Sequence, residues 1–174
     1  SPHSAVWNNT VTPTNTPPTA PTSLAAAIEN GQVQLQWQPA SDVQTPAPSL
    51  SYNLRVGTMS GAGDVLGAEA ETNGFRLKPA LGNAQLRTNT SLILPPGTYY
   101  WSVQAVDAAW AGGSFAPEAS FVVPPPSLSL VRSNAAAILS WQPAYGGWVL
   151  QQNGSLAPTG WTNSPSGSLN PVMV

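Results

Sequence analysis

The sequence predicts an all-β protein that consists of a β-sandwich followed by a second, smaller sandwich-like β module. Three observations predict this class. Apolar residues recur at every second position in several short runs, glycines and prolines separate these runs, and no segment shows the three-to-four spacing of an amphipathic helix. Regular short strands joined by turns are typical of sandwiches and barrels.

The first strands are expected at residues 32–38 and 52–56, where apolar and polar residues alternate. Their apolar residues are Val33, Leu35, Trp37, Tyr52, Leu54 and Val56. Further strands are expected at 91–94 and 119–123, and glycines mark the turns between them.

The stretch from Leu94 to Asp107 is the most informative part of the chain. A Pro-Pro-Gly turn precedes a strand in which every second residue from Tyr99 to Ala105 is apolar, which predicts a half-buried antiparallel strand. A tyrosine directly after such a turn is typical of a tyrosine corner, where the ring enters the core and the hydroxyl binds the preceding loop. Alternation favours Tyr99 for this role, and Tyr100 is the alternative.

A second set of strands follows Pro124-Pro125-Pro126. Its alternating apolar residues are Leu128, Leu130, Ala137, Leu139, Trp141, Trp148 and Leu150. The sequence Leu-Ser-Trp-Gln-Pro-Ala at 139–144 repeats Leu-Gln-Trp-Gln-Pro-Ala at 35–40. We therefore expect a tail at 1–18, a domain at 19–123, a stiff linker at 124–126 and a small module at 127–174.

Composition limits the possible partners. Only 7% of the 174 residues are charged, the net charge is −2 and there is no cysteine. Such a chain has no basic stripe for nucleic acid, no disulfide and no apolar run long enough to span a membrane. Because weakly charged surfaces repel one another little, self-association is favoured. The chain has no secretion signal and no initial methionine, so we expect a processed piece of a longer precursor.

Residues 19–123 resemble a fibronectin type III domain of large bacterial surface proteins. Trp37 matches the core tryptophan of the second strand, 52–56 matches the third strand, and Leu94 with 96–99 matches the turn before the tyrosine corner. The usual spacing has one more residue between this turn and the tyrosine. The resemblance implies an immunoglobulin-like sandwich that is extracellular and serves as a spacer or in adhesion.

Both ends of the chain show weaker resemblances. Residues 1–17 resemble the end of an FG-GAP β-propeller repeat, and residues 127–174 resemble a β module that follows such domains in bacterial exported proteins. In that family a further strand normally follows the position of Val174. The resemblance therefore implies a module that is one strand short and has an open edge.

Catalytic and metal chemistry finds little support. The single histidine, His3, lies in the tail, and Asp107 with Glu118 is the only carboxylate pair that we weigh for glycoside hydrolysis. Three acidic residues on one loop are possible calcium ligands: Asp64, Glu69 and Glu71. Solvated turn residues explain both groups better, so we predict no enzyme, no cofactor and no metal.

Three functions remain open. The first is a non-catalytic spacer or adhesion module that binds a protein partner. The second is a filament subunit, in which strand donation joins copies head to tail. The third is carbohydrate binding through an exposed Trp110 or Trp161. The candidate interaction residues are Val6, Trp7, Trp110, Trp161, Val172 and Val174.

Overall fold

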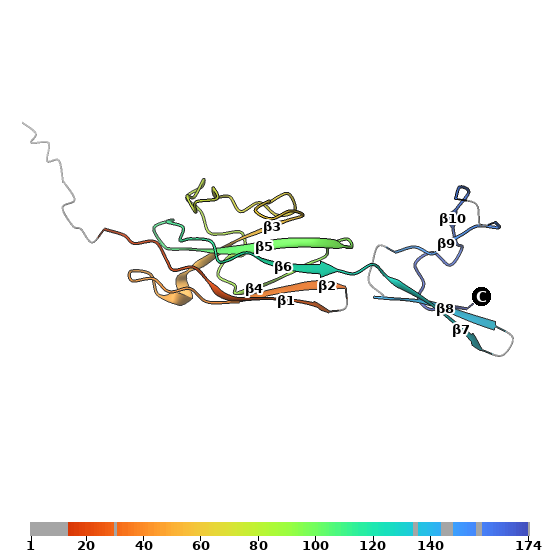
Figure 1. Cartoon of the computed structure of the whole chain (residues 1–174). Coiled ribbons are helices and arrows are strands. Elements are labelled where there is room, and N and C mark those ends of the chain that lie inside the picture. The colour runs from red at the N-terminus through yellow and green to blue at the C-terminus, as the bar shows by residue number, and fades with distance from the viewer. Residues whose placement is uncertain (1–13, 30, 134–135, 144–147, 156–157, 174) are drawn as a thin grey trace, which may run out of the picture.

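The computed structural model describes residues 14–29, 31–133, 136–143, 148–155 and 158–173. Two three-stranded antiparallel sheets face each other in the first part of the chain (Figure 1). One sheet has the order β1 (Thr22–Glu29), β2 (Gln32–Gln38), β4 (Asn89–Leu92). The other has the order β3 (Ser51–Gly57), β5 (Gly97–Val106), β6 (Ala119–Val123), and a short 3-10 turn, η1 (Ala47–Ser49), precedes β3. This strand order confirms the predicted fibronectin type III-like β-sandwich.

The core lies between these two sheets, and alternation in the sequence places it there. In β2, Val33, Leu35 and Trp37 are buried while most of the intervening glutamines are exposed. The ring of Trp37 meets Tyr52 edge-on at 5.6 Å and Trp101 at 6.3 Å. Aromatic pairs in such arrangements add to the stabilisation that comes from their buried area.

Tyr99 forms the tyrosine corner, as alternation predicts. Its side chain is 4% exposed, its ring stacks on Phe121 at 5.5 Å, and its hydroxyl donates a hydrogen bond of 2.9 Å to the carbonyl oxygen of Pro95. Burial raises the pKa of this hydroxyl above its ordinary value, with the charge of Asp64 acting in the same direction. The bond ties the turn before β5 to the core.

The outer face of the β3-β5-β6 sheet differs from the prediction of a half-buried strand. Ser102 and Gln104 are fully buried, and so is Asn53 on the neighbouring strand. The segment between β3 and β4 covers this face, so its polar side chains need partners within the protein. Asn53 Nδ2 donates to Gln104 Oε1 at 3.0 Å, and Gln104 Nε2 donates to the carbonyl oxygens of Gly74 and Gly113 at 2.6 and 2.8 Å.

The second part of the chain contains two small antiparallel ladders beyond the end of β6 (Figure 1). One has the order β11 (Val172–Met173), β8 (Ala136–Gln142), β7 (Ser127–Ser133), and the other pairs β9 (Gln151–Gln152) with β10 (Thr162–Asn163). The side-chain amide of Asn170 extends the first ladder, because it accepts from Trp141 N–H at 3.1 Å and donates to the Trp141 carbonyl oxygen at 2.8 Å.

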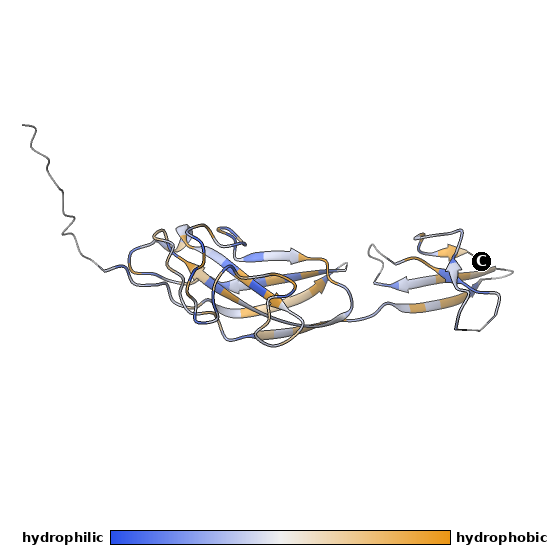
Figure 2. Cartoon of the chain, turned by 90° about the horizontal axis from the view of Figure 1, so that it is seen from above, coloured by the Kyte–Doolittle hydropathy of each residue, from blue (hydrophilic) through white to orange (hydrophobic). Residues whose placement is uncertain are grey.

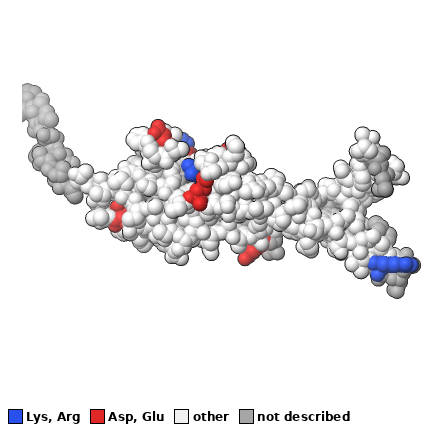
Figure 3. Space-filling view, in the orientation of Figure 1, with Lys and Arg blue, Asp and Glu red and all other residues white. Residues whose placement is uncertain are grey.

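Apolar strand segments occur in both parts of the chain, and charged residues are few in both. Figure 2 shows apolar segments in the strands of the smaller unit that follows the sandwich. Figure 3 shows a few charged residues, some of opposite sign side by side, on an otherwise uncharged face. Among the described residues, no helix is long and apolar enough to cross a membrane.

We expect Tyr99→Phe to lower the free energy of unfolding by about 1 kcal/mol, because it removes a buried hydrogen bond and leaves the Pro95 carbonyl oxygen unpaired. Urea denaturation followed by tryptophan fluorescence measures this change. Tyr100→Phe is the matched control, since Tyr100 is only partly buried. Equal losses in the two variants would contradict the assignment of the corner to Tyr99.

Candidate interaction surfaces

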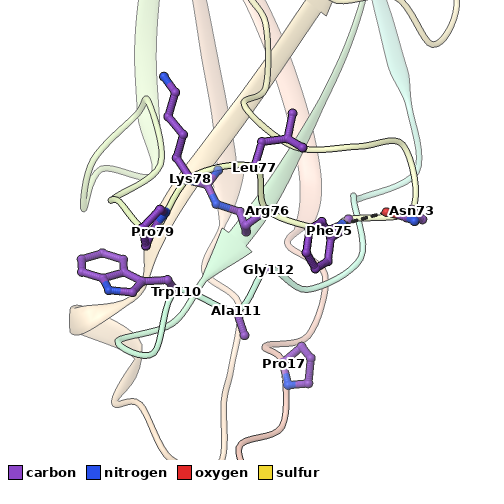
Figure 4. Close-up of a pocket in the computed structure, with 11 residues that line it drawn as sticks. Pro17, Asn73, Phe75, Arg76, Leu77, Lys78, Pro79, Trp110, Ala111 and Gly112 are labelled. Atoms are coloured by element: carbon purple, nitrogen blue, oxygen red, sulfur yellow. Dashed lines mark hydrogen bonds between the residues drawn. The ribbon is translucent and has the colours of Figure 1, made fainter.

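A groove of about 660 Å³ lies where the 73–79 segment meets the turn after β5 (Figure 4). We call it the Trp110 groove. Its lining residues come from three segments that are distant in sequence: Pro17, Asn73, Gly74, Phe75, Arg76, Leu77, Lys78, Pro79, Trp110, Ala111 and Gly112. A volume of this size lies in the range of ligand-binding sites.

The buried amide of Gln104 fixes the two walls of the Trp110 groove relative to each other. Its two donated hydrogen bonds reach Gly74 in one wall and Gly113, which directly follows the other wall at Gly112. Gly74 adopts φ = +93°, and a Cβ atom there would lie 2.7 Å from the carbonyl oxygen of Gly113. A larger residue at position 74 would therefore separate the walls.

Asp107 positions Trp110. Its Oδ1 accepts hydrogen bonds of 2.8 Å from the N–H groups of Ala109 and Ala111, which closes the turn around Trp110. Trp110 has φ = +67°, a left-handed conformation that is unfavourable for a bulky L-residue. Its side chain is 38% exposed. The turn thus holds a large aromatic ring at the surface at a conformational cost, an arrangement that is found most often at functional sites.

The exposed apolar part of the groove comes mainly from residues that sequence analysis did not single out. Phe75 is 67% exposed and Leu77 is 60% exposed. In the view of Figure 4, Arg76 lies between Phe75 and Trp110. Apolar and polar residues alternate from Phe75 to Lys78, but the run is only four residues long and belongs to no strand of the two sheets, so alternation alone does not mark it as an interaction surface.

Arg76 is a buried cation without a carboxylate partner among the described residues. It is 9% exposed, and its Nη1 and Nη2 atoms donate to the carbonyl oxygens of Ala68 and Ala80 at 3.5 and 3.0 Å. Its Nε is buried and has no hydrogen-bond partner in the described part of the chain. Desolvation lowers the pKa of Arg76, while the nearby charge of Glu69 acts in the opposite direction.

The three-stranded sheet β11-β8-β7 offers a second surface, which we call the C-terminal sheet. On one face, Leu128 pairs with Trp141 and Leu130 with Leu139. Leu128 and Leu130 remain 64% and 67% exposed, and Trp141 is 6% exposed. β7 is an edge strand with apolar side chains on both faces, because Val131 on the opposite face is also 54% exposed.

The carboxylates weighed for catalysis and calcium binding are held by separate local contacts. Glu118 accepts from Arg55 Nη2 at 3.1 Å, Ser60 Oγ at 2.6 Å and Gly61 N–H at 2.9 Å. Burial alone would raise the pKa of Glu118, but these hydrogen bonds and the charge of Arg55 together lower it. Within the described ranges, no three His, Asp or Glu side chains gather closely enough to hold a metal ion.

The predicted interaction residues do not gather at one place. Trp110 lines the groove, and Trp161 is 48% exposed in the second part of the chain. Val172 is 7% exposed in β11, where it pairs with Leu139. Val6, Trp7 and Val174 lie outside the described residues.

No protein-family model and no curated protein sequence matches the chain. Its structure is similar to parts of several solved structures. They include the chicken interferon gamma receptor alpha chain, which is 16% identical with a TM-score of 0.35, over 70% of this chain and 56% of that one. The FN1–FN3 domains of chicken CNTN1 are 15% identical with a TM-score of 0.39, over 92% of this chain and 58% of that one.

The central fibronectin-III array of RIM-binding protein is 17% identical with a TM-score of 0.36, over 93% of this chain and 59% of that one. The chain thus spans less than two thirds of the length of each of these structures. Its strand order and tyrosine corner, rather than these remote similarities, define the fold.

The left-handed backbone at Trp110 gives a prediction that separates the loss of the ring from the relief of backbone strain. Trp110→Ala and Trp110→Gly both remove the ring, but glycine tolerates φ = +67° without steric cost. We expect the glycine variant to be more stable than the alanine variant by about 1 kcal/mol, measured by urea denaturation. Ala109→Gly is the matched control and is expected to destabilise. A glycine variant less stable than the alanine variant would contradict the strained turn.

Proposed function

We propose that the chain is a non-catalytic spacer and protein-interaction module of an extracellular bacterial protein. The observation that carries this proposal is that the incoming segment is fixed to the sandwich. Asn15 Nδ2 donates to Asp107 Oδ2 at 2.6 Å, and Thr16 Oγ1 donates to Gln44 Oε1 at 2.8 Å. A spacer needs such fixed joints if it is to hold neighbouring domains at a set distance.

The outgoing segment supports the same function. The chain enters near Asn15 and leaves after β6, at the opposite end of the sandwich (Figure 1). The sequence Pro124-Pro125-Pro126 restricts the backbone at that exit and favours an extended conformation. The resemblance of residues 19–123 to domains of large bacterial surface proteins supports the extracellular assignment.

Loss of the hydrogen bond between Asn15 and Asp107 is expected to make the position of the N-terminal segment relative to the sandwich more variable. The chain has no cysteine, so Thr14→Cys and Ser127→Cys can carry two spin labels without background labelling. We expect a narrow distance distribution in the wild-type background and a clearly broader one with Asp107→Ala. Glu29→Ala, an exposed carboxylate at the end of β1, is the control. Equal widths in all three proteins would contradict the fixed joint.

A second candidate function is assembly of copies through strand addition, and the C-terminal sheet favours it. An exposed apolar edge strand readily pairs with a strand of another chain. The notable feature of β7 is that Leu128 and Leu130, on one face of the strand, are both more than half exposed, while β7 stands at the edge of its described sheet. The segment around Val6 and Trp7 of another copy is the proposed donor.

Assembly through this edge is expected to be sensitive to one added charge. Light scattering after size-exclusion chromatography should show concentration-dependent oligomers of the wild type and monomers of Leu130→Lys, because the lysine would place a charge in the apolar face. Ser129→Lys adds the same charge on the opposite face of β7 and should keep the oligomers. Removal of residues 1–12 should also abolish assembly. A monomeric wild type would exclude this candidate and leave the spacer function standing.

A further inference from the structure

The Trp110 groove presents positive charge without a lining carboxylate. Its ionisable lining residues are Arg76 and Lys78, both cations. Lys78 Nζ donates to Glu69 Oε1 at 2.6 Å outside the lining, and its side chain is 60% exposed, so further N–H donors face solvent. The groove is therefore complementary to an acidic group.

The buried guanidinium strengthens this complementarity. A buried charge is normally paired, because taking it out of water is costly. Arg76 makes two hydrogen bonds to neutral carbonyl oxygens and leaves Nε unpartnered among the described residues. Glu69 is near enough for its charge to act on Arg76 but makes no ion pair with it among the described residues, so a carboxylate placed in the groove would add negative charge beside the guanidinium.

The rest of the lining suits apolar side chains. Phe75, Leu77 and Trp110 are exposed on the same groove, next to Pro17 and Pro79. Aromatic residues together with arginine are the residues that most often dominate the binding energy of protein interfaces. Exposed clusters of this kind on a monomer mark interaction sites.

We propose that the Trp110 groove binds an extended peptide segment of a partner protein, in which an Asp or Glu side chain is flanked by apolar residues. The carboxylate lies toward Arg76 and Lys78, and the apolar side chains pack on Phe75 and Trp110. This inference rests on the proposed function as a protein-interaction module and names its site and its ligand.

A neutral glycan fits the same groove less well. Sugar recognition needs free polar side chains that both donate and accept hydrogen bonds, in addition to an aromatic ring. The amide of Asn73 is already used, because Oδ1 accepts from Phe75 N–H at 2.8 Å and Nδ2 donates to Glu71 at 3.3 Å. The other polar groups of the lining side chains are the two cations and the Trp110 indole N–H, which only donate.

The test uses the full chain and a displayed library of random twelve-residue peptides. We expect the selected peptides to contain an acidic residue next to apolar ones. Fluorescence anisotropy with labelled peptides should show about tenfold weaker binding to Phe75→Ala and to Lys78→Gln. Replacing the acidic residue of the peptide by its amide should weaken binding by a similar factor, and binding should weaken as salt is added.

Two controls show whether a loss of peptide binding comes from the groove itself. Phe75 and Lys78 are largely exposed, so their variants should unfold at the same urea concentration as the wild type. Trp161→Ala removes an exposed tryptophan elsewhere and should bind the peptides as the wild type does. Arg76 is left unchanged, since its contacts with Ala68 and Ala80 make it part of the fold.

Three results would overturn the proposal: no peptide is selected, the selected peptides lack acidic residues, or they bind the Phe75 and Lys78 variants unchanged. Preferential binding of polygalacturonate over the peptides would assign the groove to an acidic glycan instead. If the groove binds no such peptide but the spin-label distance distribution is narrow, the peptide proposal fails and the spacer function stands. The two failures are therefore distinguishable.

Discussion

The hydrogen bonds of the Gln104 side chain are the interaction on which the rest of the structure depends. The amide lies fully buried on the outer face of the β3-β5-β6 sheet, and it links Asn53, Gly74 and Gly113. Gln104 therefore connects the segment that covers the sheet with the turn after β5. An apolar residue at position 104 would leave two buried carbonyl oxygens unpaired, and such losses cost about 1–3 kcal/mol each.

Asp107 connects this arrangement to the N-terminal segment. Its Oδ1 closes the turn that holds Trp110, while its Oδ2 accepts from Asn15. Gly113 lies against the backbone of Pro18, where a Cβ atom would overlap the carbonyl oxygen. The joint with the preceding segment and the wall of the Trp110 groove are thus parts of one structure, and a change in either one affects the other.

Local patterns in the sequence predicted the sandwich but only part of the groove. Alternation identified Trp37 and Tyr99, because strand geometry places every second residue in the core. Trp110 was found as a tryptophan in a loop. Phe75 and Arg76 were missed, because their positions depend on the packing of an irregular segment against a sheet, and the partners of Arg76 are backbone carbonyl oxygens that no residue pattern reveals.

The contrast between the two parts of the chain decides which function each can perform. In the sandwich, aromatic packing and a connected set of buried hydrogen bonds fix a single arrangement, so this part can hold distances and present a formed groove. In the described residues after 126, Trp141 and Val172 are the only buried large apolar residues, and most of the apolar face of β7 remains exposed. So small a core gives little stability on its own. Further apolar contact at the C-terminal sheet would therefore stabilise this module, whereas the sandwich needs none. We therefore expect contacts with another strand at the C-terminal sheet and peptide recognition at the Trp110 groove.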